Sequence, residues 1–381
     1  MAEYDIIPMS KYDQEKGEIY KLSNGLEIYV KDGFLFLPKI FKIENHQNEI
    51  EDFKPCGLYN IGGVCYMNAI LQCFYYCKPL TEYFLKLHNN KNLGLISKGY
   101  YDFVKGLTSG NKGAAKNFNE AIIKNDDIFD DKGGNDSKDV AMLILSELHN
   151  ELKPNEDIEK IKLERKVNYY DINDVYNEKM ELIRMNGTST IISETFNFFM
   201  KCEQQCSQKC QKYYKPYYTI ETDNIIILDL ETLFPRDNIK ISVEDALKSY
   251  TSYKKIECRY CKKKSLYIKY KFCTLPKILI LVLSRGYHNK FKCKIDFKET
   301  LDMNDYYESV DSENYINTKY NLIGATFAFD WNSYEGTGHT VAFCKAYQNN
   351  NYYVFNDRSV RKTNINEIYG KMPYLLFYER A

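Results

Sequence analysis

Residues 57–74 read GLYNIGGVCYMNAILQCF, and this stretch decides the fold of the chain. Apolar side chains recur at spacings of three and four from Met67 to Phe74, which predicts an amphipathic helix that begins near Cys65. A Gly-Gly pair precedes the cysteine and lets the backbone approach a substrate closely. Free N–H groups at a helix N-terminus favour a thiolate, so Cys65 is a candidate nucleophile. An isolated cysteine is more often a small buried side chain, so this interpretation depends on its partners.

Three further residues supply what a cysteine nucleophile needs. A thiol needs a base from elsewhere in the chain, and of the five histidines His339 lies where a Gly turn meets a predicted strand, in EGTGHTVAFCKAY. Asn356 follows another predicted strand and can orient the imidazole, although an ordinary Asn-Asp turn is the alternative. The Asn60 amide, upstream of the nucleophile, can donate to a developing oxyanion.

Two groups of cysteines predict a structural metal site. Cys258 and Cys261 are separated by two residues, the spacing of a metal knuckle. Upstream, CEQQCSQKC supplies Cys202, Cys206 and Cys210. Two pairs can close a tetrahedral site of four thiolates, which leaves no position for water and is therefore structural. The alternative is a set of reduced surface thiols left from a site that no longer binds metal.

Length and composition limit the class of protein. The chain has 381 residues, more than the roughly 250 to 300 at which a single core stops growing, so we expect one large catalytic domain with subregions or two domains. The 52 basic and 52 acidic residues balance, which argues against a general nucleic-acid binder. The sequence has no long apolar run and no signal-peptide pattern. We therefore expect a cytoplasmic or nuclear protein whose twelve cysteines are reduced.

Helical patterns precede strand patterns along the chain. Residues 100–125 and 136–153 have helical periodicity, and residues 154–190 are predicted to be a surface segment with some helix. From about residue 217 the pattern becomes that of strands. Helices first and strands later predict an α+β fold with segregated layers. Residues 1–55 are predicted to be a β-rich N-terminal extension without chemistry of its own.

Two separated motifs resemble the ubiquitin-specific protease family. GLYNIGGVCYMNAILQCF is similar to the cysteine box of that family, close to GLxNLGNTCYMNSxLQ. GHTVAFCKAYQNNNYYVFNDRSV is similar to its histidine box, GHYxAxxK followed by WYxFNDxxV. Between them, in the family's order, GGNDSKDVAMLILSEL resembles the QQDAHEFL helix, and ECRYCKKKSLYIKYKF resembles the stretch with the second zinc pair. The resemblance covers about residues 56–380 and is far more specific than a lone motif.

The resemblance implies a papain-like cysteine protease fold with a helical thumb, a β palm and zinc-pinned β fingers. The catalytic domain would span residues 56–381, with the thumb at about 56–190 and the fingers at about 197–270. The palm would take about 217–240 and 271–381. In this family the fingers hold the body of ubiquitin, and its C-terminal tail lies in the cleft between thumb and palm.

The resemblance also implies a role for each candidate residue. Cys65 would be the nucleophile, His339 the general base and acid, and Asn356 the residue that orients the imidazole. Asn60 would supply the oxyanion donor. Asp357, next to the third residue, would help to polarise the histidine or to bind in the oxyanion region.

Counting from Phe196, as in the family, selects Cys206 and Cys210 as the first zinc pair. With Cys258 and Cys261 they would hold one structural zinc ion, and Cys202 remains an alternative ligand. No organic cofactor is expected.

The sequence departs from the family pattern next to both boxes. Val64 replaces the usual threonine before the nucleophile, and Thr340 replaces the usual aromatic residue after the histidine. Three functions remain open: an active deubiquitinase, a protease for another ubiquitin-like modifier, or a catalytically silent ubiquitin-binding module. We expect ubiquitin or ubiquitinated proteins as partners, no nucleic acid and no membrane, and a monomer or a subunit of a larger complex.

Overall fold

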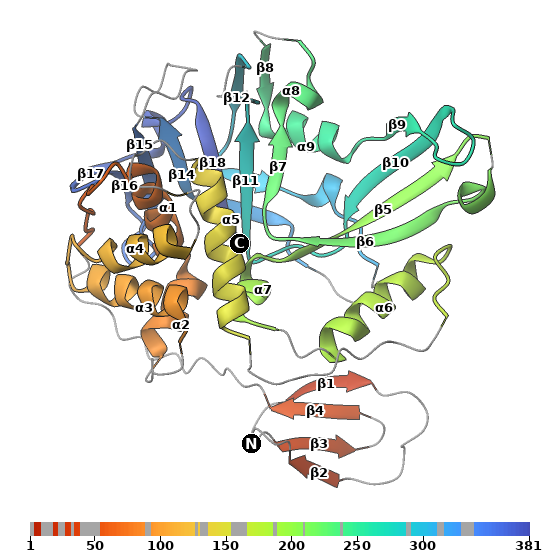
Figure 1. The fold of residues 1–381 in the computed structure, drawn as a ribbon, viewed down its shortest axis with the longest axis horizontal. Helices are drawn as coiled ribbons and strands as arrows, with labels where there is room; N and C mark the ends of the chain where they lie inside the picture. The colour runs from red at the N-terminus through yellow and green to blue at the C-terminus, as the bar shows by residue number, and fades with distance from the viewer. Residues whose placement is uncertain are drawn as a thin grey trace. The chain divides into compact units, whose positions relative to one another are not determined.

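The fold is described from a computed structural model (Figure 1). The chain divides into two compact units, Met1–Asp52 and Phe53–Ala381, and each is described by itself. In the first unit the structure describes the backbone of four strands. In the second it describes residues 54–381 except 88–92, 126–128, 130–135, 154–165, 186–188, 209, 237–238, 287–290, 311–315 and 329–338. The histidines at 46, 88 and 288 lie outside the described residues.

The N-terminal unit contains one antiparallel sheet in the order β1-β4-β3-β2. Its strands are β1 (Tyr4–Pro8), β2 (Glu18–Lys21), β3 (Glu27–Lys31) and β4 (Phe34–Pro38). Strands β2 and β3 pair on either side of an Asn-Gly step, a dipeptide typical of hairpin turns. The described residues of this unit therefore form four strands.

A layer of helices forms the first part of the second unit (Figure 1). It contains α1 (Cys65–Tyr75), α2 (Lys78–Lys86), α3 (Leu95–Thr108), α4 (Lys116–Asn125), α5 (Ser137–Glu151) and α7 (Ile191–Phe196). Helix α6 (Ile172–Met185) lies apart from this layer and packs against β6 (Tyr217–Asp223). The helical pattern at residues 100–125 is two helices, because Gly110 at φ 80° ends α3. Asp136 caps α5 by accepting a hydrogen bond from the Lys138 backbone, in agreement with the predicted polar helix start.

The central sheet follows the order β17-β16-β15-β14-β18-β11-β7, and β13 pairs with β14. Its strands are β7 (Ile226–Asp229), β11 (Ile278–Ser284), β13 (Thr300–Asp302), β14 (Lys319–Ala328), β15 (Thr340–Lys345), β16 (Tyr352–Asn356), β17 (Ser359–Thr363) and β18 (Pro373–Arg380). The short helices α8 (Leu230–Leu233) and α9 (Val243–Thr251) and the pair β8 (Ile239–Ser242) and β12 (Cys293–Asp296) complete this part.

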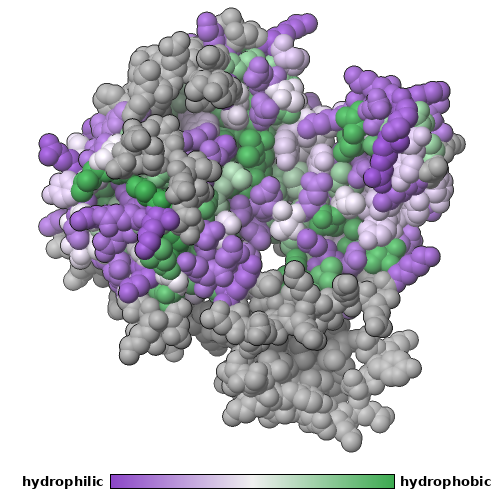
Figure 2. All heavy atoms as spheres, in the orientation of Figure 1, coloured by the Kyte–Doolittle hydropathy of each residue, from purple (hydrophilic) through white to green (hydrophobic). Residues whose placement is uncertain are grey.

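A second sheet, which we call the finger sheet, has the order β6-β5-β10-β9. It consists of β5 (Phe198–Cys206), β6 (Tyr217–Asp223), β9 (Lys254–Glu257) and β10 (Lys264–Phe272). It extends away from the central sheet, at the right of Figure 1. In the space-filling view the surface is hollowed between the finger sheet and the helical layer, and hydrophilic residues cover much of the finger sheet (Figure 2).

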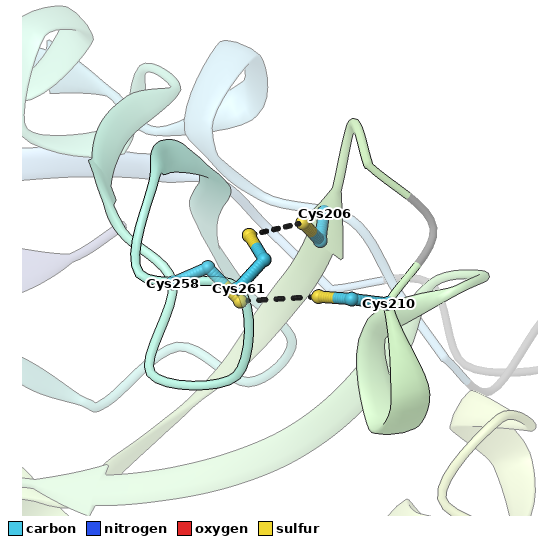
Figure 3. A group of neighbouring side chains, drawn as sticks. All are labelled: Cys206, Cys210, Cys258 and Cys261. Atoms are coloured by element: carbon cyan, nitrogen blue, oxygen red, sulfur yellow. Dashed lines mark hydrogen bonds between the residues drawn. The ribbon is translucent and has the colours of Figure 1, made fainter.

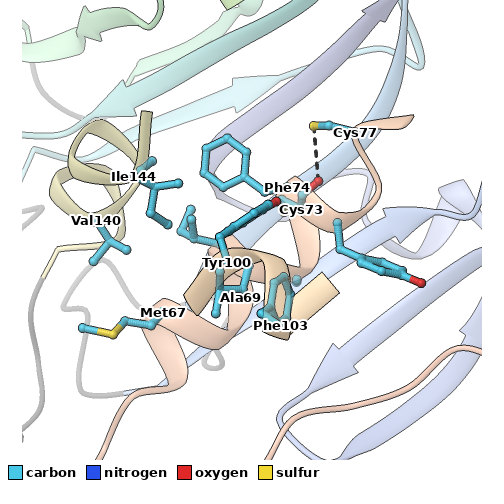
Figure 4. Close-up of a cluster of buried hydrophobic side chains, with 14 of the residues drawn as sticks. Met67, Ala69, Cys73, Phe74, Cys77, Tyr100, Phe103, Val140 and Ile144 are labelled. Carbon is cyan, nitrogen blue, oxygen red and sulfur yellow. Dashed lines mark hydrogen bonds between the residues drawn. The ribbon is translucent and has the colours of Figure 1, made fainter. Parts of the chain in front are cut away.

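The main core lies between the helical layer and one face of the central sheet, and α1 is at its centre (Figure 4). Every residue of α1 is buried, because the helix packs on β15 and β14 on one side and on α5 on the other. The Phe74 ring meets Phe196 and Phe377 edge to face, with centroids 5.8 and 5.5 Å away. This packing fixes where α1 begins relative to the sheet.

The cysteines are not joined by disulfides. All twelve lie in described residues, and none of them forms a disulfide bond. Among the described residues no helix is long and apolar enough to cross a membrane.

Candidate active site and candidate metal centre

Cys65 is the first residue of α1, as the sequence predicts. The two preceding glycines, Gly62 and Gly63, have φ values of 81° and 77°, a left-handed conformation that residues with a side chain rarely adopt. Val64 occupies the N-cap position and offers no side-chain hydrogen bond to the helix. The glycine pair therefore turns the chain abruptly into the helix, with the Cys65 side chain 4% exposed.

His339 and Asn356 meet at the edge of the central sheet. His339 immediately precedes β15 and Asn356 ends β16, and these strands are antiparallel neighbours. The His339 Nε2 atom lies 2.6 Å from Oδ1 of Asn356. Because an amide oxygen only accepts hydrogen bonds, Nε2 carries the hydrogen and Nδ1 is the basic nitrogen of the ring.

Cys65 lies beside the residue that follows this histidine. The backbone N–H of Thr340 donates a hydrogen bond to the Cys65 sulfur, so replacing the usual aromatic side chain leaves this contact intact. Burial raises the pKa of the Cys65 thiol, and the negative charge of Asp357 adds to the rise. The N–H groups of Thr340 and of the helix N-terminus act in the opposite direction but are outweighed. The helix start favours the thiolate, as expected from the sequence, but burial of the sulfur outweighs this effect.

Asp357 connects the elements of the site. Its Oδ1 atom accepts a hydrogen bond from Nδ2 of Asn68 at 2.9 Å, and its Oδ2 atom lies 3.7 Å from Nε2 of His339. Its backbone carbonyl accepts from the Leu58 N–H at 2.9 Å. Asp357 has a φ of 48°, which asparagine and aspartate tolerate better than most residues. This turn thus contacts the nucleophile's helix, the loop before it and the histidine.

The loop before the nucleophile is held against the same turn. At Gly57 an added Cβ would lie 2.4 Å from the Asp357 carbonyl oxygen, so only glycine allows this approach. The Gln72 side chain donates to the Cys56 carbonyl at 2.9 Å, and Asn68 donates to the Tyr59 carbonyl at 3.2 Å. The loop is therefore fixed from both sides.

Asn68 and Gln72 are site residues whose roles the sequence reasoning missed. Both lie in the cysteine box, but the sequence alone assigns them no function. With Cys65 they occupy positions i, i+3 and i+7 of one helix, and this spacing places all three on one face. Polar residues on the nucleophile's face of an otherwise apolar helix are the signal that points to them.

The structure brings four of the five predicted site residues together: Cys65, His339, Asn356 and Asp357. Asn60 is exposed in the loop before the glycine pair, and its role as an oxyanion donor stays a prediction. A helix that begins at a cysteine and packs on a sheet carrying the histidine and the asparagine is the arrangement of a papain-like cysteine protease.

The candidate metal centre lies at the end of the finger sheet, where Cys206, Cys210, Cys258 and Cys261 converge (Figure 3). Their four sulfur atoms lie within 4.8 Å of one another, with Cys206 and Cys261 3.9 Å apart and Cys210 and Cys258 3.3 Å apart. A tetrahedral zinc ion with Zn–S bonds of about 2.3 Å needs sulfur atoms separated by about 3.8 Å. The residues therefore fit zinc. Cys202, the alternative ligand, lies outside this group.

Two properties of the cluster suit a cation. The Ser265 hydroxyl lies 3.2 Å from the Cys206 sulfur and 3.1 Å from that of Cys261, and sequence reasoning gave this serine no role. Burial and then the neighbouring thiols raise the pKa of Cys210 to about 12, whereas hydrogen bonds led by that from Ser265 outweigh burial and lower the pKa of Cys206 to about 6. Four thiolates this close together need a positive charge between them.

Comparison with known proteins identifies the family. Residues 56–378 match the family model described as "Ubiquitin carboxyl-terminal hydrolase", and the chain belongs to this family. Ubiquitin carboxyl-terminal hydrolase 16 of Arabidopsis thaliana is 25% identical over 345 residues, which are 87% of this chain and 31% of that protein. Ubiquitin carboxyl-terminal hydrolase 2 of Homo sapiens is 22% identical over 357 residues, which are 85% of this chain and 55% of that protein. The chain thus spans between about a third and about half of these relatives.

Solved structures agree on the fold. The SAGA Ubp8/Sgf11/Sus1/Sgf73 DUB module bound to ubiquitin aldehyde matches with a TM-score of 0.64 and 19% identity, over 86% of this chain and 69% of that chain. The Ubp8-Sgf11-Sgf73-Sus1 SAGA DUB module matches with a TM-score of 0.62 and 19% identity, over 86% and 67% of the two chains. The predicted α+β fold class, with a four-cysteine cluster at the finger sheet, is confirmed.

Proposed function

We propose that this chain is a deubiquitinase that cleaves the isopeptide or peptide bond after the C-terminal glycine of ubiquitin. One geometric observation supports the proposal most directly. The hydrogen bond from His339 to Asn356 leaves Nδ1 as the basic nitrogen, and the next residue, Thr340, contacts the Cys65 sulfur. Membership of the family and the match to a module bound to ubiquitin aldehyde support ubiquitin as the substrate.

The reaction would proceed by nucleophilic catalysis. Nδ1 of His339 takes the Cys65 proton, and the sulfur attacks the carbonyl carbon of the terminal glycine. Asn60 donates to the oxyanion, and the imidazolium returns its proton to the leaving amine. Water, deprotonated by His339, then hydrolyses the thioester, which releases the ubiquitin carboxylate and restores the thiol. Asn356 holds the ring orientation throughout.

Because the pKa of Cys65 is raised, His339 has to accept the thiol proton during the reaction. Burial and the charge of Asp357 raise the pKa of the Cys65 thiol and so favour its protonated form in the resting site. Proton transfer to the histidine therefore accompanies the attack, and the helix N–H groups stabilise the sulfur only once charge has formed.

The finger sheet would be stabilised by one structural zinc ion bound to Cys206, Cys210, Cys258 and Cys261. The ion would hold the β9–β10 knuckle against the end of β5, and it takes no part in the chemical step. Ubiquitinated proteins are the proposed partners, and assembly into a larger complex is consistent with the multi-subunit modules that share the fold. Cysteines without disulfide bonds suit the proposed cytoplasmic or nuclear location.

Reaction with ubiquitin carrying an electrophilic C-terminus tests the proposal. We expect a covalent adduct on Cys65, found by peptide mapping, and hydrolysis of a ubiquitin C-terminal aminocoumarin amide. Cys65→Ala should abolish both, whereas Cys202→Ser, a buried cysteine outside both sites, should retain both.

Each other outcome has a distinct meaning. Hydrolysis retained in Cys65→Ala would refute the role of that residue. Capture by another ubiquitin-like modifier, with none by ubiquitin, would mean a different substrate on the same machinery. Tight ubiquitin binding without turnover would identify a silent binding module.

A further inference from the structure

A cavity of about 380 Å³ adjoins the loop before the nucleophile. Ile61, Gly62 and Val64 form one wall, and residues of α4 with the turn before it form the other. Among the described residues, those that line it all lie in helices and loops and none in a strand. The described wall of the cavity is therefore part of the helical layer and begins one residue before Cys65.

The cavity is joined rigidly to the catalytic turn through Lys112, one of its lining residues. The Tyr59 backbone N–H donates to the Lys112 carbonyl at 2.9 Å, and the Lys112 ammonium donates to the Arg358 carbonyl at 3.4 Å. Arg358 follows Asp357, so the cavity wall and the turn that faces His339 are held together.

We infer that this cavity binds the leaving-group side of the substrate, namely the peptide that flanks the modified lysine, with a preference for acidic and apolar side chains. The inference rests on the proposed function. The ubiquitin tail is expected between the helical layer and the central sheet, whereas the described residues that line this cavity include none from a strand. The chain on the other side of the scissile bond needs a separate surface next to Cys65, and the cavity offers one.

The chemistry of the lining defines the occupant. Among the described lining residues, the lysines Lys112, Lys116 and Lys124 face a single glutamate, Glu120. Lys116 and Glu120 are 3.9 Å apart and largely exposed, so the pair is weak and leaves a net positive rim. Such a rim attracts acidic side chains.

The floor of the cavity is suited to a peptide. Ile61, in the wall formed by the nucleophile loop, and Tyr59 of the same loop are 61% and 48% exposed, which gives this wall an apolar surface. Asn119 lines the cavity and is only 6% exposed, and within the described part of the chain its Oδ1 atom accepts no hydrogen bond. A buried amide with unused hydrogen-bonding capacity is costly unless a ligand or water completes it, and a peptide main chain supplies the missing donor.

Three ubiquitin derivatives test the inference. One carries a peptide with glutamate and leucine around the isopeptide-linked lysine, one carries a peptide with lysine and serine there, and one carries aminocoumarin alone. We expect kcat/KM for the acidic peptide to exceed that for the basic peptide by about fivefold at low salt, and the ratio to shrink as salt screens the charges.

Charge reversal should move this ratio. In the double variant K116E/K124E we expect kcat/KM for the acidic peptide to fall below kcat/KM for the basic peptide. Asn119→Ala should lower kcat/KM for both peptide derivatives relative to kcat/KM for the aminocoumarin derivative. Lys98→Glu, a charge reversal at an exposed position of α3 outside the cavity, should leave the ratio as it is.

The outcomes separate the two proposals. This inference would be overturned, and the proposed function left intact, if the enzyme released aminocoumarin but cleaved both peptide derivatives at equal rates. That equality would have to hold in the wild type and in a folded double variant. No turnover of any ubiquitin derivative would overturn both.

Discussion

The Asn68 amide donates a 2.9 Å hydrogen bond to the Asp357 carboxylate and so joins the nucleophile's helix to the turn after β16. The same amide donates to the Tyr59 carbonyl at 3.2 Å. Asn68 is 2% exposed, so water cannot readily replace these bonds when the side chain is shortened. Asn68 is therefore a positioning residue that fixes Cys65 relative to His339.

Asn68→Ala is expected to lower the unfolding free energy by about 1–3 kcal/mol, because two acceptors lose their donor. We expect kcat on ubiquitin aminocoumarin amide to fall roughly 10- to 100-fold, since the nucleophile and base lose alignment. KM should change little, because Asn68 is buried in the protein core. Steady-state kinetics with urea unfolding measures all three quantities.

Asn150→Ala is the matched control, an exposed asparagine near the end of α5. It should leave both kinetics and stability close to those of wild type. If Asn68→Ala raised KM and left kcat unchanged, the positioning role would be contradicted.

Asn356 provides a second test of alignment. Asn356→Ala removes the oxygen that holds His339 Nε2 at 2.6 Å, and we expect kcat/KM to fall roughly 100-fold. Asn356→Asp keeps an acceptor oxygen and should recover most of this loss. Its negative charge stabilises the imidazolium, so the acidic limb of the pH–rate profile should move to higher pH. An unchanged profile, or equal losses in the two variants, would count against the proposed contact.

The protonation of Cys65 leads to a pH-dependent prediction. The pKa of this thiol is raised above its ordinary value of 9.0, mainly by burial. Below that pKa each unit of pH should increase iodoacetamide alkylation of Cys65 about tenfold, since the thiolate is the reactive form. Mass spectrometry of the Cys65 peptide between pH 6 and 10 measures the rate, and the urea-unfolded chain serves as the reference.

The same shift affects stability, and its sign follows from the direction. Because folding raises the pKa, the folded state binds the proton more tightly, and this contribution is fully present below pH 9.0. It is lost as pH rises through the folded-state pKa. An alkylation rate that stays constant from pH 6 to 9 would instead indicate an ion pair between Cys65 and His339 in the resting enzyme.

The sequence predicts the parts of this site that depend on local pattern. The helix at Cys65 follows from apolar spacing, and His339 follows from its place between glycine and a strand. The contact between Asn68 and Asp357 joins residues 289 positions apart and depends on how α1 packs against the turn, which periodicity does not contain. The sequence indicates that the helix start favours a thiolate, but the burial that raises the pKa of Cys65 is a property of the assembled core.

Spacing alone also left the first metal pair open. Cys202 and Cys206 both point to the same side of β5, because side chains alternate along a strand. The pairing of β5 with β10 sets Cys202 opposite Tyr270 and Cys206 opposite Leu266, close to the knuckle. The register between β5 and β10 therefore decides which of the two cysteines lies near Cys258 and Cys261.

Removal of the metal is the last test. We expect one zinc ion per chain, and Cys258→Ser should lose it, because Cys258 is fully buried and its sulfur is 3.3 Å from that of Cys210. Cys202→Ser should retain the ion, since it removes a cysteine of the same strand outside the cluster. Loss of the ion should lower the melting temperature and raise KM for ubiquitin substrates more than it lowers kcat, because the cluster lies in the finger sheet and not beside Cys65. Metal analysis that found no zinc in the wild-type chain, with equal melting temperatures for the two serine variants, would mean that the four thiols are the remnant of a lost site.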